Sequence, residues 1–292
     1  IHIYLGRPVN LGFALHFPLL QRKGNNIMCA SGTEEQQMRI LRAIISSFAR
    51  QSDFSVDIMA DSYASVYREY KPEILEFGKN YPEIRVHDDL EDICYKIVET
   101  LEIIKDRSNT RKQLIVWLGL DSMADILADE RNKRTPVLKK AEEKATQSEV
   151  SESVSEEESE KTDFNDPALD EFSALFGDMD LFGEEDINEE EPETGKEAQT
   201  SYLYDARNDI ARIIHLGPTC NVFNLVIYDS ASALRDFREV KTLDFNHKIA
   251  FPMSDYEAGE FLDQPRLIRE LSGQLAYYHN GRSGNRFVPY KL

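Results

Sequence analysis

The chain has 292 residues, 41% of them apolar, and a formal net charge of −19 at pH 7, which is enough for one large core or two smaller ones. Its three cysteines, Cys29, Cys94 and Cys220, are odd in number and far apart, which excludes a disulfide framework and a clustered zinc site and predicts reduced, buried thiols. No apolar run approaches the roughly 18 residues of a membrane span and no signal peptide is visible, so we expect a cytoplasmic protein without a bound metal.

Apolar runs rich in β-branched residues alternate with segments of helical period. This alternation is typical of βα units around a mainly parallel sheet, so the sequence predicts an α/β fold. The predicted strands lie near residues 1–5, 54–59, 84–86, 114–120, 222–228 and 248–253. The predicted helices lie near residues 38–48, 61–75, 88–104, 122–127 and 202–216. Asp88 and Glu91 resemble a capping box at the start of the third predicted helix.

Residues 31–38 lie where a nucleotide-binding P-loop, GxxxxGK[ST], would follow a strand. Such a loop uses glycines so that main-chain N–H groups surround the phosphates, a lysine to meet their charge, and a hydroxyl to ligate Mg²⁺. Aligned without gaps, Gln37 stands at the lysine position and Met38 at the hydroxyl position. Glu34 and Glu35 put two negative charges at the helix N-terminus, where phosphate would bind.

The residues of this vestigial nucleotide pocket are predicted to be Ser31, Gly32, Thr33, Glu34, Gln36, Gln37, Met38 and Asp121. The alternative interpretation is an ordinary strand, turn and helix with acidic residues in the first helical turn, since such turns recur throughout α/β domains.

The run 114–120 is the most continuously apolar stretch of the chain and predicts a central strand covered on both faces. A Walker B strand ends in Asp-Glu, the Asp holding the magnesium shell and the Glu polarising the attacking water, whereas here Asp121 is followed by Ser122. Three interpretations are open: Asp121 retains the aspartate's place, Gly119 occupies it instead, or Asp121 caps the next helix. In each of them the hydrolytic pair is incomplete, so we expect no catalytic residue.

From residue 139 to residue 200 the composition changes to Glu, Ser, Asp and Lys. Residues 151–200 hold 19 of the chain's 53 acidic residues and two of its 34 basic ones, so they carry a charge of −17 and the rest of the chain carries −2. The nearly neutral remainder gives no electrostatic indication of DNA binding. We therefore predict one domain, in two parts at 1–138 and 201–292, that is interrupted by a disordered acidic insertion at 139–200.

Apolar residues punctuate the acidic insertion. Acidic stretches with embedded Phe and Leu often dock as short amphipathic helices in a partner's groove or on a basic surface. The alternatives are a solvated insertion that rests a helical turn on its own domain, and an acidic mimic of DNA. The candidate partner-binding residues are Leu169, Phe172, Leu175, Phe176, Leu181 and Phe182.

Five blocks outside the insertion resemble, in order, the FtsK/SpoIIIE family of P-loop ATPases. In the most extensive, at 212–227, a helix ends at Gly217 and Asn221 stands at the turn glycine, where Asn tolerates the left-handed backbone. The other blocks are LGRPV at 5–9 with GNNIM at 24–28, FNHKIAFPMSD at 245–255, FLD at 261–263 and RFVPY at 286–290. The resemblance implies a three-layer RecA-like P-loop NTPase fold, in an ATPase that moves DNA or that moves proteins in type VII secretion.

We therefore expect a catalytically degenerate FtsK/SpoIIIE-type domain, C-terminal in a larger protein, that acts in assembly, regulation or substrate handling within a multi-domain translocase. The expected partners are other ATPase domains of the same polypeptide or of a homo-oligomer, a protein partner for the acidic segment, and DNA. The resemblance implies ATP and Mg²⁺ as cofactors, but Gln37 and Met38 predict that this pseudo-ATPase domain binds neither and is no enzyme by itself. Two alternatives are open: an adaptor that works through the acidic Phe/Leu-rich insertion, and an ATP-binding DNA translocase domain with an atypical P-loop.

Overall fold

The structure is a computed structural model that describes residues 1–10, 13–107, 110–128, 206–235, 237–262 and 264–291. The acidic insertion and the predicted domain boundaries next to it lie outside the described residues and stay predictions.

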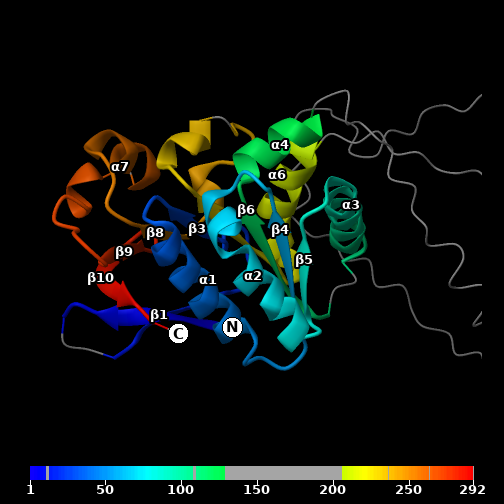
Figure 1. Cartoon of the computed structure of the whole chain (residues 1–292), viewed down its shortest axis with the longest axis horizontal. Helices are drawn as coiled ribbons and strands as arrows, with labels where there is room; N and C mark the ends of the chain where they lie inside the picture. The colour runs from blue at the N-terminus through cyan, green and yellow to red at the C-terminus, as the bar shows by residue number, and fades with distance from the viewer. Residues whose placement is uncertain (11–12, 108–109, 129–205, 236, 263, 292) are drawn as a thin grey trace, which may run out of the picture. The chain divides into compact units, whose positions relative to one another are not determined.

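In the described part of the chain, ten strands form one mixed sheet in the order β2-β1-β10-β9-β8-β3-β7-β6-β4-β5 (Figure 1). Its parallel part is made of β3 (Ile27–Ala30), β4 (Phe54–Ala60), β5 (Ile84–His87), β6 (Lys112–Leu118), β7 (Val222–Tyr228) and β8 (His247–Ala250). An antiparallel extension beyond β8 is made of β1 (His2–Pro8), β2 (Leu15–Pro18), β9 (Ala276–His279) and β10 (Gly284–Pro289).

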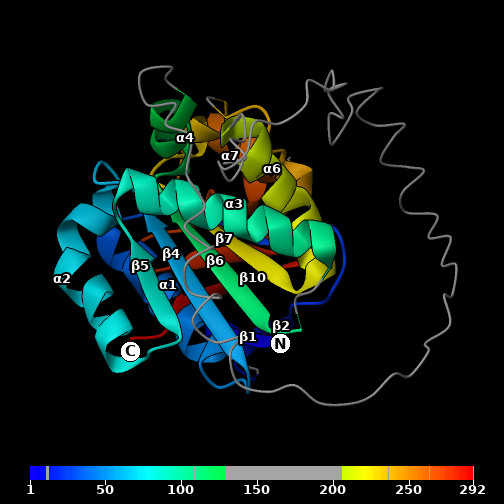
Figure 2. The same ribbon diagram turned by 90° about the vertical axis from the view of Figure 1, so that its right-hand side faces the viewer.

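Helices cover both faces of the parallel strands, which confirms the predicted three-layer α/β fold (Figure 2). One face carries α1 (Glu34–Phe48) and α2 (Ser65–Asn80). The other face carries α3 (Leu90–Asp106), α4 (Leu120–Ala128), α6 (Ala206–Leu216) and α7 (Asp255–Leu262). Because both faces are covered, every residue of β7 is buried, which explains its continuous apolar sequence.

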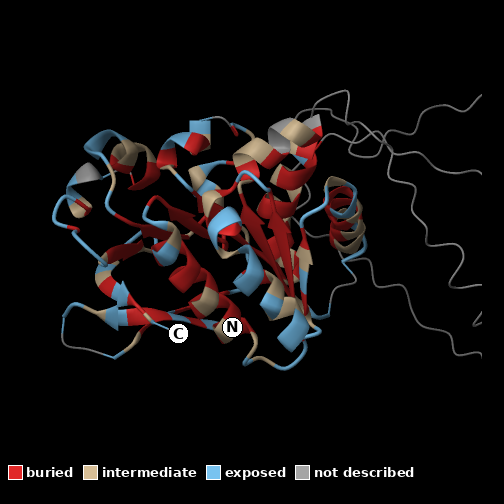
Figure 3. Cartoon of the chain, viewed as in Figure 1, coloured by how far each residue is buried: buried red, intermediate tan, exposed pale blue. Residues whose placement is uncertain are grey.

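Helix α1 is buried over most of its surface, because the antiparallel extension and α2 pack against it as well as the parallel strands (Figure 3). Ile3 and Phe17 of this extension pack in the same core as Ile44 of α1. The Tyr4 main-chain N–H also donates to Ser47 Oγ over 3.1 Å. The wide apolar stripe of α1 is thus explained by packing against the parallel strands, the antiparallel extension and α2 together.

A buried polar chain fixes how the central strands align. Trp117 Nε1 on β6 donates to Asn224 Oδ1 on β7 over 3.0 Å, and the Asn224 main-chain N–H and Nδ2 donate to Asn26 Oδ1 over 2.9 and 3.0 Å. Asn26 Nδ2 donates in turn to the Ile214 carbonyl oxygen of α6. Since an unpaired buried amide costs about 1–3 kcal/mol, a shift in strand register would carry a heavy penalty.

Two local predictions are wrong in detail. Helix α3 is capped by Asp89, whose carboxylate accepts from the N–H groups of Glu91 and Asp92, while Asp88 accepts from the Tyr67 hydroxyl and from Lys71. The predicted helix 61–75 begins at Ser65, because the chain first forms a turn around the carboxylate of Asp61.

Candidate functional site

In the described part of the chain, β3 and β4 each lead to one face of the sheet while both of their parallel neighbours lead to the other face, so one crevice lies at the carboxyl end of each of these two strands. At the first crevice, β3 leads into α1 on one face while its neighbour β7 leads into a 3-10 helix at Ala231–Arg235 on the other face. At the second, β4 leads to α2 and its neighbour β6 to α4, again on opposite faces. Open α/β sheets bind ligands where neighbouring connections diverge in this way. These two crevices are therefore the candidate sites of the described domain.

The first crevice contains the β3–α1 turn, which consists of only three residues, Ser31, Gly32 and Thr33. Ser31 and Gly32 adopt left-handed backbone conformations, with φ of 64° and 90°. Thr33 is the N-cap of α1 and forms a capping box with Gln36. The eight-residue P-loop motif therefore has no equivalent loop here, and a gap-free alignment places Gln36 and Gln37 inside the helix.

Four main-chain amides, two in this turn and two in the first turn of α1, bond within the protein. Ser31 N–H donates to the Tyr228 carbonyl oxygen over 3.1 Å, and Thr33 N–H donates to Gln36 Oε1 over 2.9 Å. Gln36 N–H donates to Thr33 Oγ1 over 3.3 Å, and Gln37 N–H to the Thr33 carbonyl oxygen over 3.0 Å. A P-loop holds phosphate with N–H groups that point at the ligand, so these four amides do not supply such a cradle.

Side chains pack around the same turn. Gln37 is 1% exposed, and its Nε2 lies 3.4 Å from the Ser31 carbonyl oxygen and 3.3 Å from that of Tyr228. The Phe251 ring lies so close to Gly32 that a Cβ at residue 32 would come within 2.7 Å of it. Met38, at the position of the magnesium-binding hydroxyl, is buried in the core beneath α1. The first crevice is therefore filled by the protein itself.

Asp121 lies in the first turn of α4, three residues beyond the end of β6, and Gly119 directly follows the strand with φ of 76°. The Tyr228 side chain is fully buried nearby, and burial, together with the negative charge of Asp121, raises the pKa of its phenol. The predicted residues 31–37 gather at the first crevice, Met38 lies in the core, and the insertion residues at 169–182 lie outside the described part.

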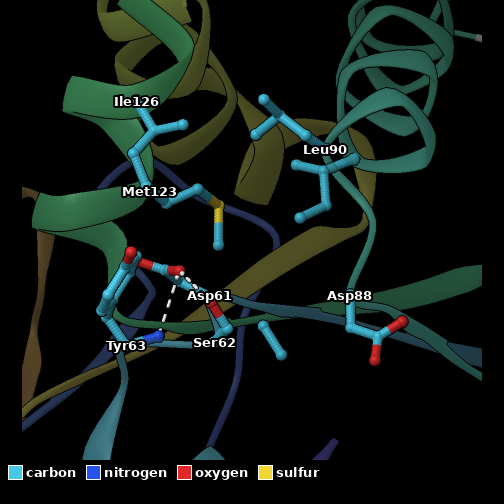
Figure 4. A pocket seen from close by; sticks show the side chains of 9 residues that line it. Asp61, Ser62, Tyr63, Asp88, Leu90, Met123 and Ile126 are labelled. Carbon is cyan, nitrogen blue, oxygen red and sulfur yellow. Dashed lines mark hydrogen bonds between the residues drawn. The ribbon is translucent and has the colours of Figure 1, made fainter.

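The second crevice holds a cavity of about 160 Å³ that the sequence does not predict (Figure 4). Its base is Asp61, which follows β4 directly and is 7% exposed. Apolar walls come from the first turns of α3 and from α4, and the rim includes Tyr63 and Asp88. The full lining is Ala60, Asp61, Ser62, Tyr63, Asp88, Leu90, Ile93, Met123 and Ile126. The available sequence signal is an aspartate directly after a strand.

A second feature that sequence reasoning missed is a buried charged cluster beneath α3. The Asp57 carboxylate of β4 contacts His87 Nε2 at 3.1 Å and Lys96 Nζ at 3.3 Å, and accepts from Gln113 Nε2 over 2.8 Å. Burial opposes the charge of Asp57, but these three partners hold its pKa below the usual value. Burial likewise opposes the charge of His87, but hydrogen bonds to Asp57 and Asp92 raise its pKa. This cluster fastens α3 to the sheet and leaves no open ligand position.

Further features of the described residues limit the chemistry. None of their helices is long and apolar enough to cross a membrane, and they contain no group of three or more His, Cys, Asp or Glu side chains arranged to hold a metal ion. Cys29, Cys94 and Cys220 are buried and outside disulfides, as the sequence predicts.

Comparisons with known proteins give a structural match and no sequence match: no protein-family model and no curated protein matches the chain. The cytoplasmic domain of the type VII secretion ATPase EccC from Thermomonospora curvata matches with a TM-score of 0.53 and 12% identity, over 99% of this chain and 28% of EccC. ATPases 2 and 3 of the same EccC, in complex with a signal sequence peptide, match with a TM-score of 0.55 and 9% identity, over 99% of this chain and 42% of the matched chain. The pCW3 conjugation coupling protein TcpA with ATPγS matches with a TM-score of 0.52 and 10% identity, over 99% of this chain and 65% of TcpA.

The chain has the fold of these ATPase domains. This finding confirms the RecA-like fold that the resemblance of the sequence blocks implies. The chain spans 28% to 65% of the length of these three proteins. At 9–12% identity the match establishes the fold alone, so the activities named for these proteins do not transfer with it.

Proposed function

We propose that this chain is a catalytically degenerate ATPase-type domain that acts in assembly, regulation or substrate handling beside active ATPase domains. The observation that carries the proposal is the three-residue β3–α1 turn. The amides of Ser31 and Thr33 in this turn, and those of Gln36 and Gln37 in α1, bond within the protein. Phosphoryl transfer depends almost entirely on positioning and electrostatic stabilisation of the phosphates. A site without a phosphate cradle, a lysine and a magnesium-binding hydroxyl supplies neither.

Three of the structural matches support the proposal that this domain works beside other ATPase domains. EccC and EssC are described by their ATPases 2 and 3, so each contains several ATPase domains in one polypeptide. By analogy, our chain is one domain of a cytoplasmic multi-domain translocase, and its partners are the neighbouring ATPase domains or further copies of itself. EccC is a type VII secretion ATPase and TcpA is a conjugation coupling protein, so the candidate substrates of the whole machine are protein and DNA.

Release of inorganic phosphate from MgATP tests the proposal. The purified chain is expected to release no phosphate above an enzyme-free blank, while circular dichroism shows that it is folded. Saturable phosphate release by the native chain that is lost in Asp121→Asn would contradict the proposal, because it would identify Asp121 as a working member of a nucleotide site.

A second candidate function is that of an adaptor, which the Phe- and Leu-punctuated acidic sequence at 164–182 favours. Deletion of residues 164–182 should abolish binding of a defined partner, such as a neighbouring ATPase domain, while leaving thermal unfolding unchanged. If the deleted chain binds that domain as tightly as the native chain does, this segment is no adaptor for it.

A further inference from the structure

The cavity of the second crevice has the size of one small molecule or one side chain. Its volume is about 160 Å³, and an engineered protein cavity of about 150 Å³ holds benzene. Leu90 and Ile93 of α3 form one apolar wall, and Met123 and Ile126 of α4 form the other. Figure 4 shows Leu90, Met123 and Ile126 above Asp61. The cavity therefore offers an apolar channel that ends at a carboxylate.

The charge of Asp61 is not balanced within the described part of the chain. Its Oδ1 accepts from the Tyr63 main-chain N–H over 3.2 Å and from Ser62 Oγ over 3.4 Å, and its Oδ2 accepts from Ser122 Oγ. All of these donors are neutral. A carboxylate removed from water loses hydration that neutral donors replace only in part. The buried site is therefore complementary to a cation.

Asp88, the second carboxylate of the cavity, differs in its surroundings. It lies at the exposed rim and already pairs with Lys71 Nζ at 2.8 Å and with the Tyr67 hydroxyl at 2.6 Å. Tyr63, also on the rim, is 71% exposed. The rim is thus open to solvent, and the unbalanced negative charge lies at the base.

We propose that the cavity binds a lysine side chain of a partner protein, with the four-carbon stem against the apolar walls and the ammonium group at Asp61. A long basic side chain buries its stem along apolar surface while its head reaches a polar group. Oδ1 of Asp61 already accepts two hydrogen bonds and Oδ2 accepts one. The remaining acceptor capacity therefore lies on one oxygen, which suits the point charge of an ammonium and lacks the two-oxygen edge that a guanidinium uses.

This proposal stands apart from the nucleotide question, because the cavity shares no lining residue with the β3–α1 turn. The position of the cavity in the sheet also supports the proposal. Open α/β sheets bind ligands where neighbouring strands connect to opposite faces, and the second crevice is such a place. It retains a cavity, while the first crevice is filled.

Methyl resonances of the full chain labelled with [¹³C-methyl]methionine test the proposal, since Met123 lines the cavity and is one of only six methionines. Met123→Leu assigns its resonance. The probes are Nα-acetyl-lysine-N-methylamide and the norleucine compound, which has a similar apolar stem and no charge. We expect the lysine probe to shift the Met123 resonance saturably, and the norleucine probe to bind about tenfold more weakly, a difference of about 1.4 kcal/mol.

Asp61→Asn should weaken binding of the lysine probe by about tenfold and leave binding of the norleucine probe unchanged, because Asn loses the charge. The Asn oxygen can still accept from the Tyr63 main-chain N–H, and its amide group can donate to Ser122 Oγ. The matched control is Asp106→Asn, an exposed aspartate at the end of α3, which should change neither. Unshifted resonances of the other methionines show that each variant is folded. The proposal would be overturned if the lysine probe does not shift the Met123 resonance, if the two probes bind with equal affinity, or if Asp61→Asn binds the lysine probe as tightly as the native chain does.

Discussion

Restoring the missing lysine should damage this domain and should not repair a nucleotide site. Gln37 is 1% exposed, so a lysine in its place would have to bury an ammonium group. Its nearest acceptors would be the carbonyl oxygens of Ser31 and Tyr228, which Gln37 Nε2 now contacts at 3.4 and 3.3 Å. Burial of this kind lowers the pKa of a lysine by up to about 3–5 units, and each unit costs about 1.4 kcal/mol. Because the two carbonyl groups partly solvate the charge, we expect Gln37→Lys to lose about 3 kcal/mol of unfolding free energy at pH 7.

Gln37→Met is the matched control. The two hydrogen bonds of Nε2 are long, and Gln37 Oε1 is buried without a partner among the described residues. Removing weak bonds and an unsatisfied acceptor together should change the unfolding free energy by less than about 1 kcal/mol.

Urea unfolding at two pH values separates the charge from the packing effect. The unfolded chain keeps the new lysine protonated up to about pH 10, whereas the buried lysine loses its proton earlier, so the deficit of Gln37→Lys should shrink between pH 7 and pH 9.5. The deficit of Gln37→Met should not change. A Gln37→Lys variant as stable as the native chain at pH 7 would refute the reasoning, since it would show that position 37 is open to solvent.

Two further predictions concern the β3–α1 turn and the buried charged cluster beneath α3. Gly32→Ala should lose about 2–4 kcal/mol of unfolding free energy, because the new Cβ would meet the Phe251 ring at 2.7 Å and φ at residue 32 is 90°. The control Gly273→Ala, at a residue with φ of 60° and open space around it, should lose about 1 kcal/mol. Equal losses in thermal or urea unfolding would exclude the clash with Phe251. His87→Gln should lose about 2 kcal/mol of unfolding free energy at pH 5.5 and less at pH 8.5. The raised pKa of His87 in the fold stabilises the protein fully below the pKa of the unfolded chain, about 6.5, and this stabilisation is lost as the pH rises through the pKa of the folded state. A loss that does not depend on pH would mean that His87 is neutral in the fold.

The sequence predicts the parallel strands well because each of them is a short apolar run with turn residues at its ends. The strand 222–228 is found at Val222–Tyr228, and Asn221 before it adopts the expected left-handed conformation with φ of 60°. Strand β2 was not predicted: only alternate residues of Leu15–Pro18 are buried, and four residues are too few to establish a period.

The candidate sites were harder to predict because they depend on backbone length and on contacts between distant segments. A gap-free alignment with a P-loop assumes a long loop, so it could not show that α1 begins at Glu34 after a three-residue turn. It also placed Met38 in the pocket, where the helical period of α1 directs that side chain into the core. Asp61 and Met123 come from different βα units, and only the sheet order brings them to one cavity.

Calorimetric titration of the full chain with MgATP tests the central claim most directly, with Glu34→Gln titrated in parallel. This variant removes one negative charge from the first turn of α1 and leaves the bonded amides of the β3–α1 turn in place. The account predicts no saturable heat from either protein, because the turn has no cradle for phosphate regardless of its charge. Saturable binding of MgATP by the native chain at micromolar concentration would contradict it, and would mean that the domain takes part in an ATP cycle.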